Sequence, residues 1–166
     1  METAHIHQPA SLMEKEMSEY EIERGKPMPS KLHSLIQMNI GFAIKARYKF
    51  QYRVLSELSI RLDGDKFVPD ISIYSLDASD WHEEEIEMTE PPLLAIEIES
   101  PSQSTDDMKA KADKYLAAGV RSVWLVLPAL AGVMVLHDGE KAQFYSDGEI
   151  MDDALGIRIP VEEVFE

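Results

Sequence analysis

Two glutamates stand at the end of a predicted strand in PPLLAIEIESPSQSTDD, residues 91–107. Residues 93–99 are mostly apolar and precede a loop rich in serine, which indicates a buried strand. Because side chains alternate between the faces of a strand, Glu97 and Glu99 share one face at its C-terminal end, where open α/β sheets bind ligands. The pair marks either a metal site or a solvated face. In a chain with 31 acidic residues, the solvated face is the commoner arrangement.

A third carboxylate lies in VPDISIY, where Pro69 precedes Asp70. Proline has no backbone N–H and therefore suits the start or the edge of a strand. If this strand and strand 93–99 deliver their carboxylates to one point, Asp70, Glu97 and Glu99 form an oxygen-rich cluster. Like charges in contact are costly unless a cation or a proton is present. Hard oxygen ligands favour Mg²⁺ or Mn²⁺ over zinc.

A helix is expected over residues 105–119, with Ser104 and Asp107 as an S-x-x-D cap and Gly119 as its end. Asp107, Lys111 and Tyr115 are spaced i, i+4, i+8 and line one face. If that face tilts toward strand 93–99, the lysine could orient a water or stabilise charge on a phosphoryl group. The more frequent alternative for such a helix is a surface lysine and a boundary tyrosine.

The remaining elements predict an α/β fold with a mixed sheet. Residues 18–30 suggest a short extended stretch and a Pro-rich loop, and residues 31–46 a helix capped by Ser30. Strands are expected at 52–62, 66–76 and 120–127, with a hairpin turn at Asp63-Gly64 and a second hairpin after residue 132. A final strand and helical turn complete the chain. The strand–helix–strand unit over 93–127 requires parallel strands, while the hairpins are antiparallel. We expect one domain over residues 18–166, after an N-terminal arm over 1–17.

Composition narrows the function. The chain has 166 residues, a net charge of −15 and no cysteine, which excludes disulfides and thiolate chemistry and fits a cytoplasmic protein. The longest apolar run, residues 123–136, is too short to span a membrane. The N-terminus does not have the pattern of a signal peptide. The negative charge opposes non-specific nucleic-acid binding, although seven of the acidic residues lie in one predicted loop, residues 77–90.

Taken in order, these segments resemble a known family. They are Pro69-Asp70, then Glu97 with Ser100-Pro101-Ser102, the helix 105–119 with Asp107, Lys111 and Tyr115, Gly119-Val120, and Trp124 in strand 120–127. ERGKP, residues 23–27, followed by His33, is similar to the family's opening segment. Together, over about residues 20–145, they resemble the putative restriction-endonuclease family of the PD-(D/E)XK nuclease superfamily.

The resemblance implies a restriction-endonuclease-like mixed sheet flanked by helices, with Mg²⁺ (or Mn²⁺) held by Asp70 and Glu97. It also implies metal-assisted hydrolysis of phosphodiester bonds. The superfamily's lysine normally stands two residues after the glutamate, where this chain has Glu99, so Lys111 on the helix would supply it. Tyr115, His33, Glu99 and Asp107 would be supporting residues. A second departure is Leu127 before Pro128, where the family usually has aspartate.

The leading hypothesis is therefore a metal-dependent endonuclease that acts on DNA rather than RNA, without a membrane association and as a homodimer, the commonest symmetric assembly. The competing hypothesis is a non-catalytic, nuclease-like scaffold or dimeric interaction module, which the negative charge favours. A third and weaker hypothesis is metal binding by His5 and His7 in the N-terminal arm, because stable sites need a preorganised shell.

Overall fold

The computed structural model describes residues 17–166. The N-terminal arm over 1–17, apart from its last residue, and the histidines at positions 5 and 7 lie outside the described residues. The helices are α1 (Glu19–Arg24), α2 (Lys31–Tyr48), α3 (Thr105–Ala117), the 3₁₀ turn η1 (Pro128–Leu130) and α4 (Val161–Phe165). The strands are β1 (Tyr52–Ser56), β2 (Ser59–Leu62), β3 (Asp65–Phe67), β4 (Ile71–Ser75), β5 (Glu87–Met88), β6 (Leu94–Ile98), β7 (Ser122–Leu127), β8 (Gly132–Leu136), β9 (Gln143–Tyr145), β10 (Glu149–Asp152) and β11 (Ile157–Pro160).

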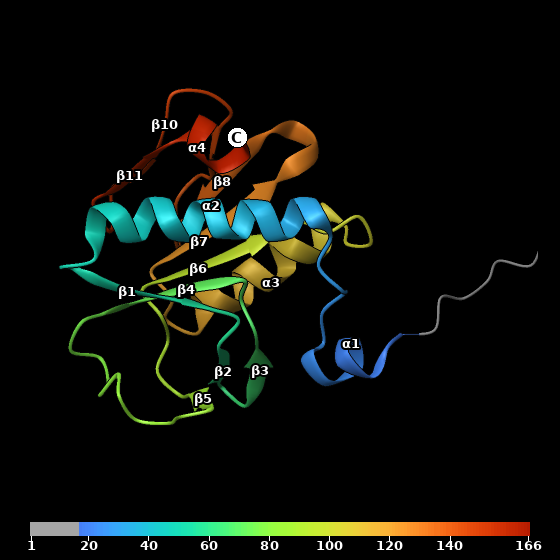
Figure 1. The fold of residues 1–166 in the computed structure, drawn as a ribbon, viewed down its shortest axis with the longest axis vertical. Coiled ribbons are helices and arrows are strands. Elements are labelled where there is room, and N and C mark those ends of the chain that lie inside the picture. The colour runs from blue at the N-terminus through green and yellow to red at the C-terminus, as the bar shows by residue number, and fades with distance from the viewer. Residues whose placement is uncertain (1–16) are drawn as a thin grey trace, which may run out of the picture.

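The central feature is a six-stranded mixed sheet in the order β1-β4-β6-β7-β8-β9. Strands β6 and β7 are parallel and are joined through α3, as the strand–helix–strand pattern predicted. The other neighbours in this sheet pair antiparallel. The predicted α/β fold with a mixed sheet flanked by helices is therefore confirmed (Figure 1).

Each face of the sheet carries its own hydrophobic core. On one face, Ile96 and Ile98 of β6 belong to the same cluster as Ile36 and Ile40 of α2. On the other face, Ala95 belongs to a cluster with side chains of α3. This division follows directly from the alternation of side chains along β6. The two helices therefore lie on opposite faces of the sheet and approach β6 from opposite sides.

Smaller elements complete the fold. Strands β3, β2 and β5 form a three-stranded sheet, and β10 pairs with β11. Helix α4 packs beside α2, where the guanidinium of Arg47 pairs with Glu163. The acidic loop 77–90 contains β5, which pairs parallel to β2. In Figure 1 this loop runs below the six-stranded sheet, on the side away from α2.

Several local predictions are confirmed. Ser30 caps α2 by accepting a hydrogen bond from the backbone N–H of His33, and Ser104 caps α3 in the same way. The turn at Asp63-Gly64 joins the antiparallel strands β2 and β3. Strands β7 and β8 flank a turn within the long apolar run, so that run is two strands.

Three local predictions are wrong. Residues 66–76 are two strands, β3 and β4, which belong to different sheets, rather than one strand. Residues 18–30 do not begin as an extended stretch, because Ser18 and Glu21 form a capping box that starts helix α1. Residues 52–62 are two strands, β1 and β2, rather than one. The chain breaks between them at Glu57, whose φ of 56° lies in the left-handed region. This break sends β1 into the large sheet and β2 into the small one.

Among residues 17–166, no helix is both long enough and apolar enough to cross a membrane.

Candidate active site

Strand register brings Asp70 beside Glu97. Strands β4 and β6 are antiparallel, and Ile71 at the start of β4 pairs with Ile96 near the end of β6. The next step along each strand therefore places Asp70 next to Glu97, although the two are distant in sequence. Both residues are buried, with exposed fractions of 0% and 3%. A hydrogen bond from backbone to side chain also holds Asp70 against β6: the N–H of Ile98 donates to Oδ2 of Asp70 at 2.7 Å.

Asp70 is surrounded by groups that stabilise its charged form. Its Oδ1 pairs with the ammonium of Lys26 and lies 3.0 Å from Nε2 of His33. Burial alone would raise the pKa of Asp70, but the hydrogen bond from His33 and the charge of Lys26 outweigh it, so the pKa is lowered. Gln37 of α2 holds the backbone as well, because its side-chain amide donates to the carbonyl oxygen of Asp70 at 2.9 Å. Asp70 is therefore held as a carboxylate.

Glu97 is held by two side chains of α3. Lys111 Nζ lies 2.7 Å from Oε1 of Glu97, and the hydroxyl of Tyr115 donates to the same oxygen at 2.7 Å. Tyr115 is fully buried, and its ring packs 4.7 Å from that of Phe67 between centroids. Burial and the nearby charge of Glu97 raise the pKa of Tyr115 well above its usual value, so the tyrosine is a neutral donor. The i, i+4 spacing of Lys111 and Tyr115 thus delivers both groups to one carboxylate oxygen.

Two predicted site residues do not join this cluster. Glu99 lies one residue beyond the end of β6, and its Oε1 accepts a hydrogen bond from the hydroxyl of Thr105 at 3.0 Å. Asp107 is exposed and completes the cap of α3, where its Oδ2 accepts from the hydroxyl of Ser104 at 2.6 Å. The helical face that carries Lys111 and Tyr115 therefore does not bring Asp107 to the two buried carboxylates.

A surface pocket of about 330 Å³ lies beside the cluster. His33, Glu99, Ser100 and Pro128 are among the residues that line it. Nε2 of His33 faces Asp70, while its buried Nδ1 has no hydrogen-bond partner among the described residues. His33 therefore links the wall of this pocket to Asp70.

The two buried carboxylates, Asp70 and Glu97, are the kind of oxygen ligand that Mg²⁺ prefers. Within residues 17–166, no group of three or more His, Asp or Glu side chains is arranged to hold a metal ion. Mg²⁺ is typically bound by one or two carboxylates together with waters and substrate phosphates, so it does not need an all-protein cage. Asp70 and Glu97 match that requirement in number and in chemistry. The ammonium groups of Lys26 and Lys111 supply the positive charge that two adjacent carboxylates need.

Sequence reasoning missed the roles of Lys26 and Gln37. Lys26 lies within ERGKP, the segment similar to the family's opening, so a signal was present without indicating which residue mattered. Its partner Asp70 is 44 residues away, and no spacing rule connects them. Gln37 sits one turn after His33 on α2, and this i, i+4 relation could have marked it as a neighbour of the site.

Comparison with known proteins identifies the family. Residues 9–162 match the family described as "Putative restriction endonuclease" (Uma2), and the chain belongs to this family. Family membership suggests a nuclease function. No curated protein shows significant similarity to the chain.

A solved structure supports the fold. It is the crystal structure of a protein from Anabaena variabilis ATCC 29413 described as "a putative nuclease belonging to DUF820". The two share 24% sequence identity with a TM-score of 0.75, over 84% of this chain and 83% of the other. At that identity, the likeness is one of fold.

Proposed function

We propose that this protein is a metal-dependent nuclease that hydrolyses phosphodiester bonds, and specifically an endonuclease acting on DNA. The observation that carries the proposal is the junction of two buried carboxylates, Asp70 and Glu97, with Lys111 Nζ 2.7 Å from Glu97. Buried carboxylates and a lysine on converging elements are arranged for charge stabilisation at a reacting phosphate. Membership of a nuclease family gives the arrangement its chemical context.

Each side chain takes a role from its contacts. Asp70 and Glu97 would hold Mg²⁺ (or Mn²⁺), which when bound supplies Lewis-acid stabilisation of the phosphoryl oxygens and activation of water. Lys111 is partly exposed, so its ammonium can also donate to a phosphate oxygen while it neutralises Glu97. Tyr115 fixes the orientation of Glu97 through its hydroxyl, and His33 does the same for Asp70.

Glu99 and Asp107 take outer positions in this proposal. Glu99 lines the adjacent pocket and is held by Thr105, so it would act on substrate or solvent there rather than as a direct ligand. Asp107 supports the site indirectly by capping α3, the helix that carries Lys111. Glu99 stands where the superfamily usually has lysine, and Thr105 holds its side chain away from Asp70 and Glu97.

Cleavage of plasmid DNA, linear DNA and RNA with Mg²⁺, Mn²⁺ and EDTA tests the proposal. We expect metal-dependent cleavage that falls at least about 100-fold in Glu97→Gln, Asp70→Asn and Lys111→Ala. The first two remove proposed metal ligands, and the third removes positive charge at the phosphate. Lys109 and Asp113 form an exposed ion pair on the same helix, so Lys109→Ala and Asp113→Asn are matched controls that should retain activity. Equal residual cleavage in all variants would indicate a contaminating nuclease and would sink the proposal.

One observation favours the alternative of a non-catalytic scaffold. Both buried carboxylates already have a lysine partner, so the site is electrically balanced without a metal. Calorimetric titration with Mn²⁺ separates the two functions. Binding that is lost in Glu97→Gln supports the nuclease, whereas no binding at millimolar Mn²⁺ supports the scaffold. Sedimentation of the same samples tests the proposed homodimer.

A further inference from the structure

The segment of residues 25–56 has an unusual charge for this chain. It contains six of the 16 lysines and arginines and none of the 31 acidic residues. It forms the loop before α2, all of α2 and strand β1. In Figure 1, α2 lies above the six-stranded sheet and the acidic loop 77–90 lies below it. One continuous segment of this strongly acidic protein is therefore free of acidic residues.

Most of these cations have no carboxylate partner in the described part of the chain. Lys49 lies over the ring of Phe50, 5.0 Å from its centre, and Arg53 donates to the backbone carbonyl oxygen of Lys49. Lys26 pairs with Asp70, and Arg47 pairs with Glu163. The other four form no ion pair with any residue in the described range 17–166; they are Lys31, Lys45, Lys49 and Arg53. Three of the four follow one another from the end of α2 into β1. They are available to an external anion.

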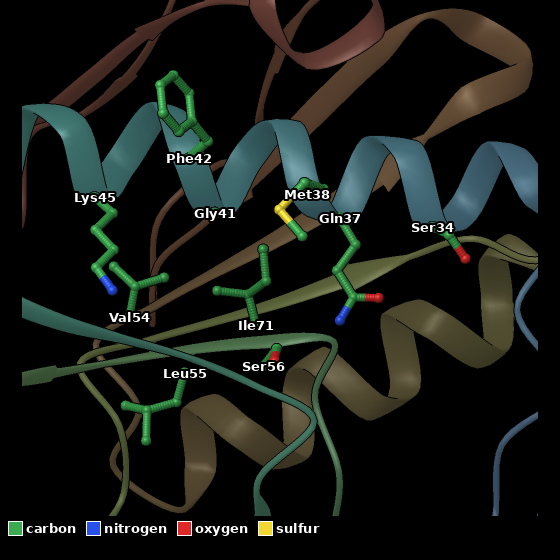
Figure 2. A pocket seen from close by; sticks show the side chains of 10 residues that line it. All are labelled: Ser34, Gln37, Met38, Gly41, Phe42, Lys45, Val54, Leu55, Ser56 and Ile71. Atoms are coloured by element: carbon green, nitrogen blue, oxygen red, sulfur yellow. The ribbon is translucent and has the colours of Figure 1, made fainter. Parts of the chain in front are cut away.

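An apolar groove runs beside these cations, between α2 and the edge strand β1. It measures about 430 Å³ and is lined by Ser34, Gln37, Met38, Gly41, Phe42, Lys45, Val54, Leu55, Ser56 and Ile71. Figure 2 shows Met38 and Lys45 reaching from α2 toward Ile71 and Val54, with Phe42 standing away from the strands. Phe42 is 72% exposed, and Phe50 just beyond α2 is 82% exposed. Two aromatic rings are thus left in solvent beside unpaired cations.

The groove borders the candidate active site. Gln37 lines it and also donates to the backbone carbonyl oxygen of Asp70. Ile71, on the groove floor, is the residue that follows Asp70. A chain lying in the groove would therefore be led toward the carboxylate cluster.

Gly41 keeps the groove open at its centre. It lies in the middle of α2, where glycine destabilises a helix relative to alanine. Packing does not require it, because an added Cβ would meet its nearest neighbour, Cδ1 of Ile71, at an ordinary 3.9 Å. The space under Gly41 belongs to the groove.

We propose that this groove binds an unpaired strand of nucleic acid and leads it to the site at Asp70 and Glu97; the inference rests on the proposed nuclease function. Unpaired cations contact the phosphates, and the exposed ring of Phe42 offers a stacking surface to a base. Positive charge combined with exposed aromatic rings is the usual recognition chemistry for single strands. The groove is of a size for small ligands and therefore admits single nucleotides but not a duplex.

Charge decides between this occupant and a second copy of the chain. The groove lining contains the cation Lys45 and no carboxylate. A polyanion is complementary to that surface, whereas an identical cationic surface is not.

Binding of fluorescein-labelled single-stranded DNA, measured by anisotropy in EDTA over a range of salt concentrations, tests the proposal. In Lys45→Gln/Lys49→Gln, loss of two phosphate contacts should lower the slope of log affinity against log salt by about 1.4. The control Lys114→Gln/Lys141→Gln removes the same charge from other exposed positions and should leave the slope unchanged. Equal slopes in both double variants overturn the proposal.

A second variant tests the stacking surface. Phe42→Ala should weaken binding at least about fivefold, the lower end for loss of one base–aromatic stack. Ile86→Ala, at an even more exposed apolar side chain in the acidic loop, should not. Sedimentation of Phe42→Ala supplies the competing outcome: a dimer that becomes monomeric with unchanged DNA affinity shows that the groove joins two copies, and overturns the proposal. Duplex DNA that binds as tightly as single-stranded DNA also overturns the proposal. The same measurement with single-stranded RNA shows whether the groove distinguishes ribose from deoxyribose.

The outcomes separate this inference from the proposed function. If Lys45→Gln/Lys49→Gln cleaves DNA and binds single strands as the wild type does, the proposed nuclease function is supported and the proposed binding groove is refuted. If binding depends on the groove but no metal-dependent cleavage occurs, strand binding in the groove is supported and the nuclease function is refuted.

Discussion

Replacing Lys26 by methionine isolates the electrostatic balance of the carboxylate cluster. The substitution keeps the length and much of the apolar stem of the side chain but removes the charge that faces Asp70. Asp70 then retains His33 and the backbone N–H of Ile98 as its partners. Breaking one side of a buried ion pair costs about 3–5 kcal/mol, because the remaining charge stays in a poorly solvated place. For a chain of this size, 3 kcal/mol lowers Tm by roughly 6–12 °C.

Urea and thermal unfolding at pH 7 in EDTA measure the effect. The matched control is Lys109→Met, which breaks an exposed ion pair with Asp113 and should cost no more than about 1 kcal/mol. Equal losses of stability in the two variants would refute the view that Lys26 and Asp70 form an energetically significant buried pair.

The pH dependence of Lys26→Met follows from the lowered pKa of Asp70 in the wild type. A depressed carboxyl pKa stabilises the fold above the unfolded pKa of about 3.9, and that contribution is lost as the pH falls through the folded pKa. Without Lys26 the pKa of Asp70 rises, so the variant regains relative stability when the carboxyl is protonated. The difference in unfolding free energy between wild type and variant should therefore be largest at neutral pH and shrink in acid. A constant difference from pH 7 to pH 3 would contradict this assignment.

Mg²⁺ provides a second readout of the same variant. In the wild type a cation at Asp70 must compete with Lys26, whereas in Lys26→Met that competition is absent. Mg²⁺ at ten times its Kd adds about 1.4 kcal/mol to the unfolding free energy. At one fixed Mg²⁺ concentration, we expect a larger rise in Tm for Lys26→Met than for the wild type. An equal rise in both would show that Lys26 does not compete with the ion.

Three further substitutions test other parts of the structure. Tyr115→Phe removes the hydroxyl that donates to Glu97 and should lower the unfolding free energy by about 1.5–3 kcal/mol, measured by urea denaturation, while Tyr20→Phe at an exposed position should not. Ser104→Ala removes the cap of α3 and should cost about 1 kcal/mol by the same measurement; no loss would show that the cap adds little. Gly41→Ala should instead stabilise the fold by up to about 1 kcal/mol, visible as a higher Tm, and a fall in Tm would mean that the added methyl does not fit beside Ile71.

Sequence alone determined the parts of this protein that depend on local rules. The alternation in residues 93–99 correctly separated Ile96 and Ile98 from Ala95, because a strand exposes successive side chains to opposite faces. Ser30 and Ser104 correctly marked helix starts, since a cap needs only its own first turn. The same helical spacing correctly grouped Lys111 with Tyr115. The family resemblance is confirmed by the match over residues 9–162.

Tertiary structure decided which of those residues meet. Asp70 reaches Glu97 only through the antiparallel register of β4 and β6, and register depends on packing across the whole sheet. Lys26 joins Asp70 across 44 residues, a contact that no local period encodes. Glu99, equal to Glu97 in the strand pattern, leaves the cluster because β6 ends at Ile98 and Thr105 holds its carboxylate. Local periodicity therefore supplied the side chains of the candidate site, while long-range packing selected the ones that are in contact.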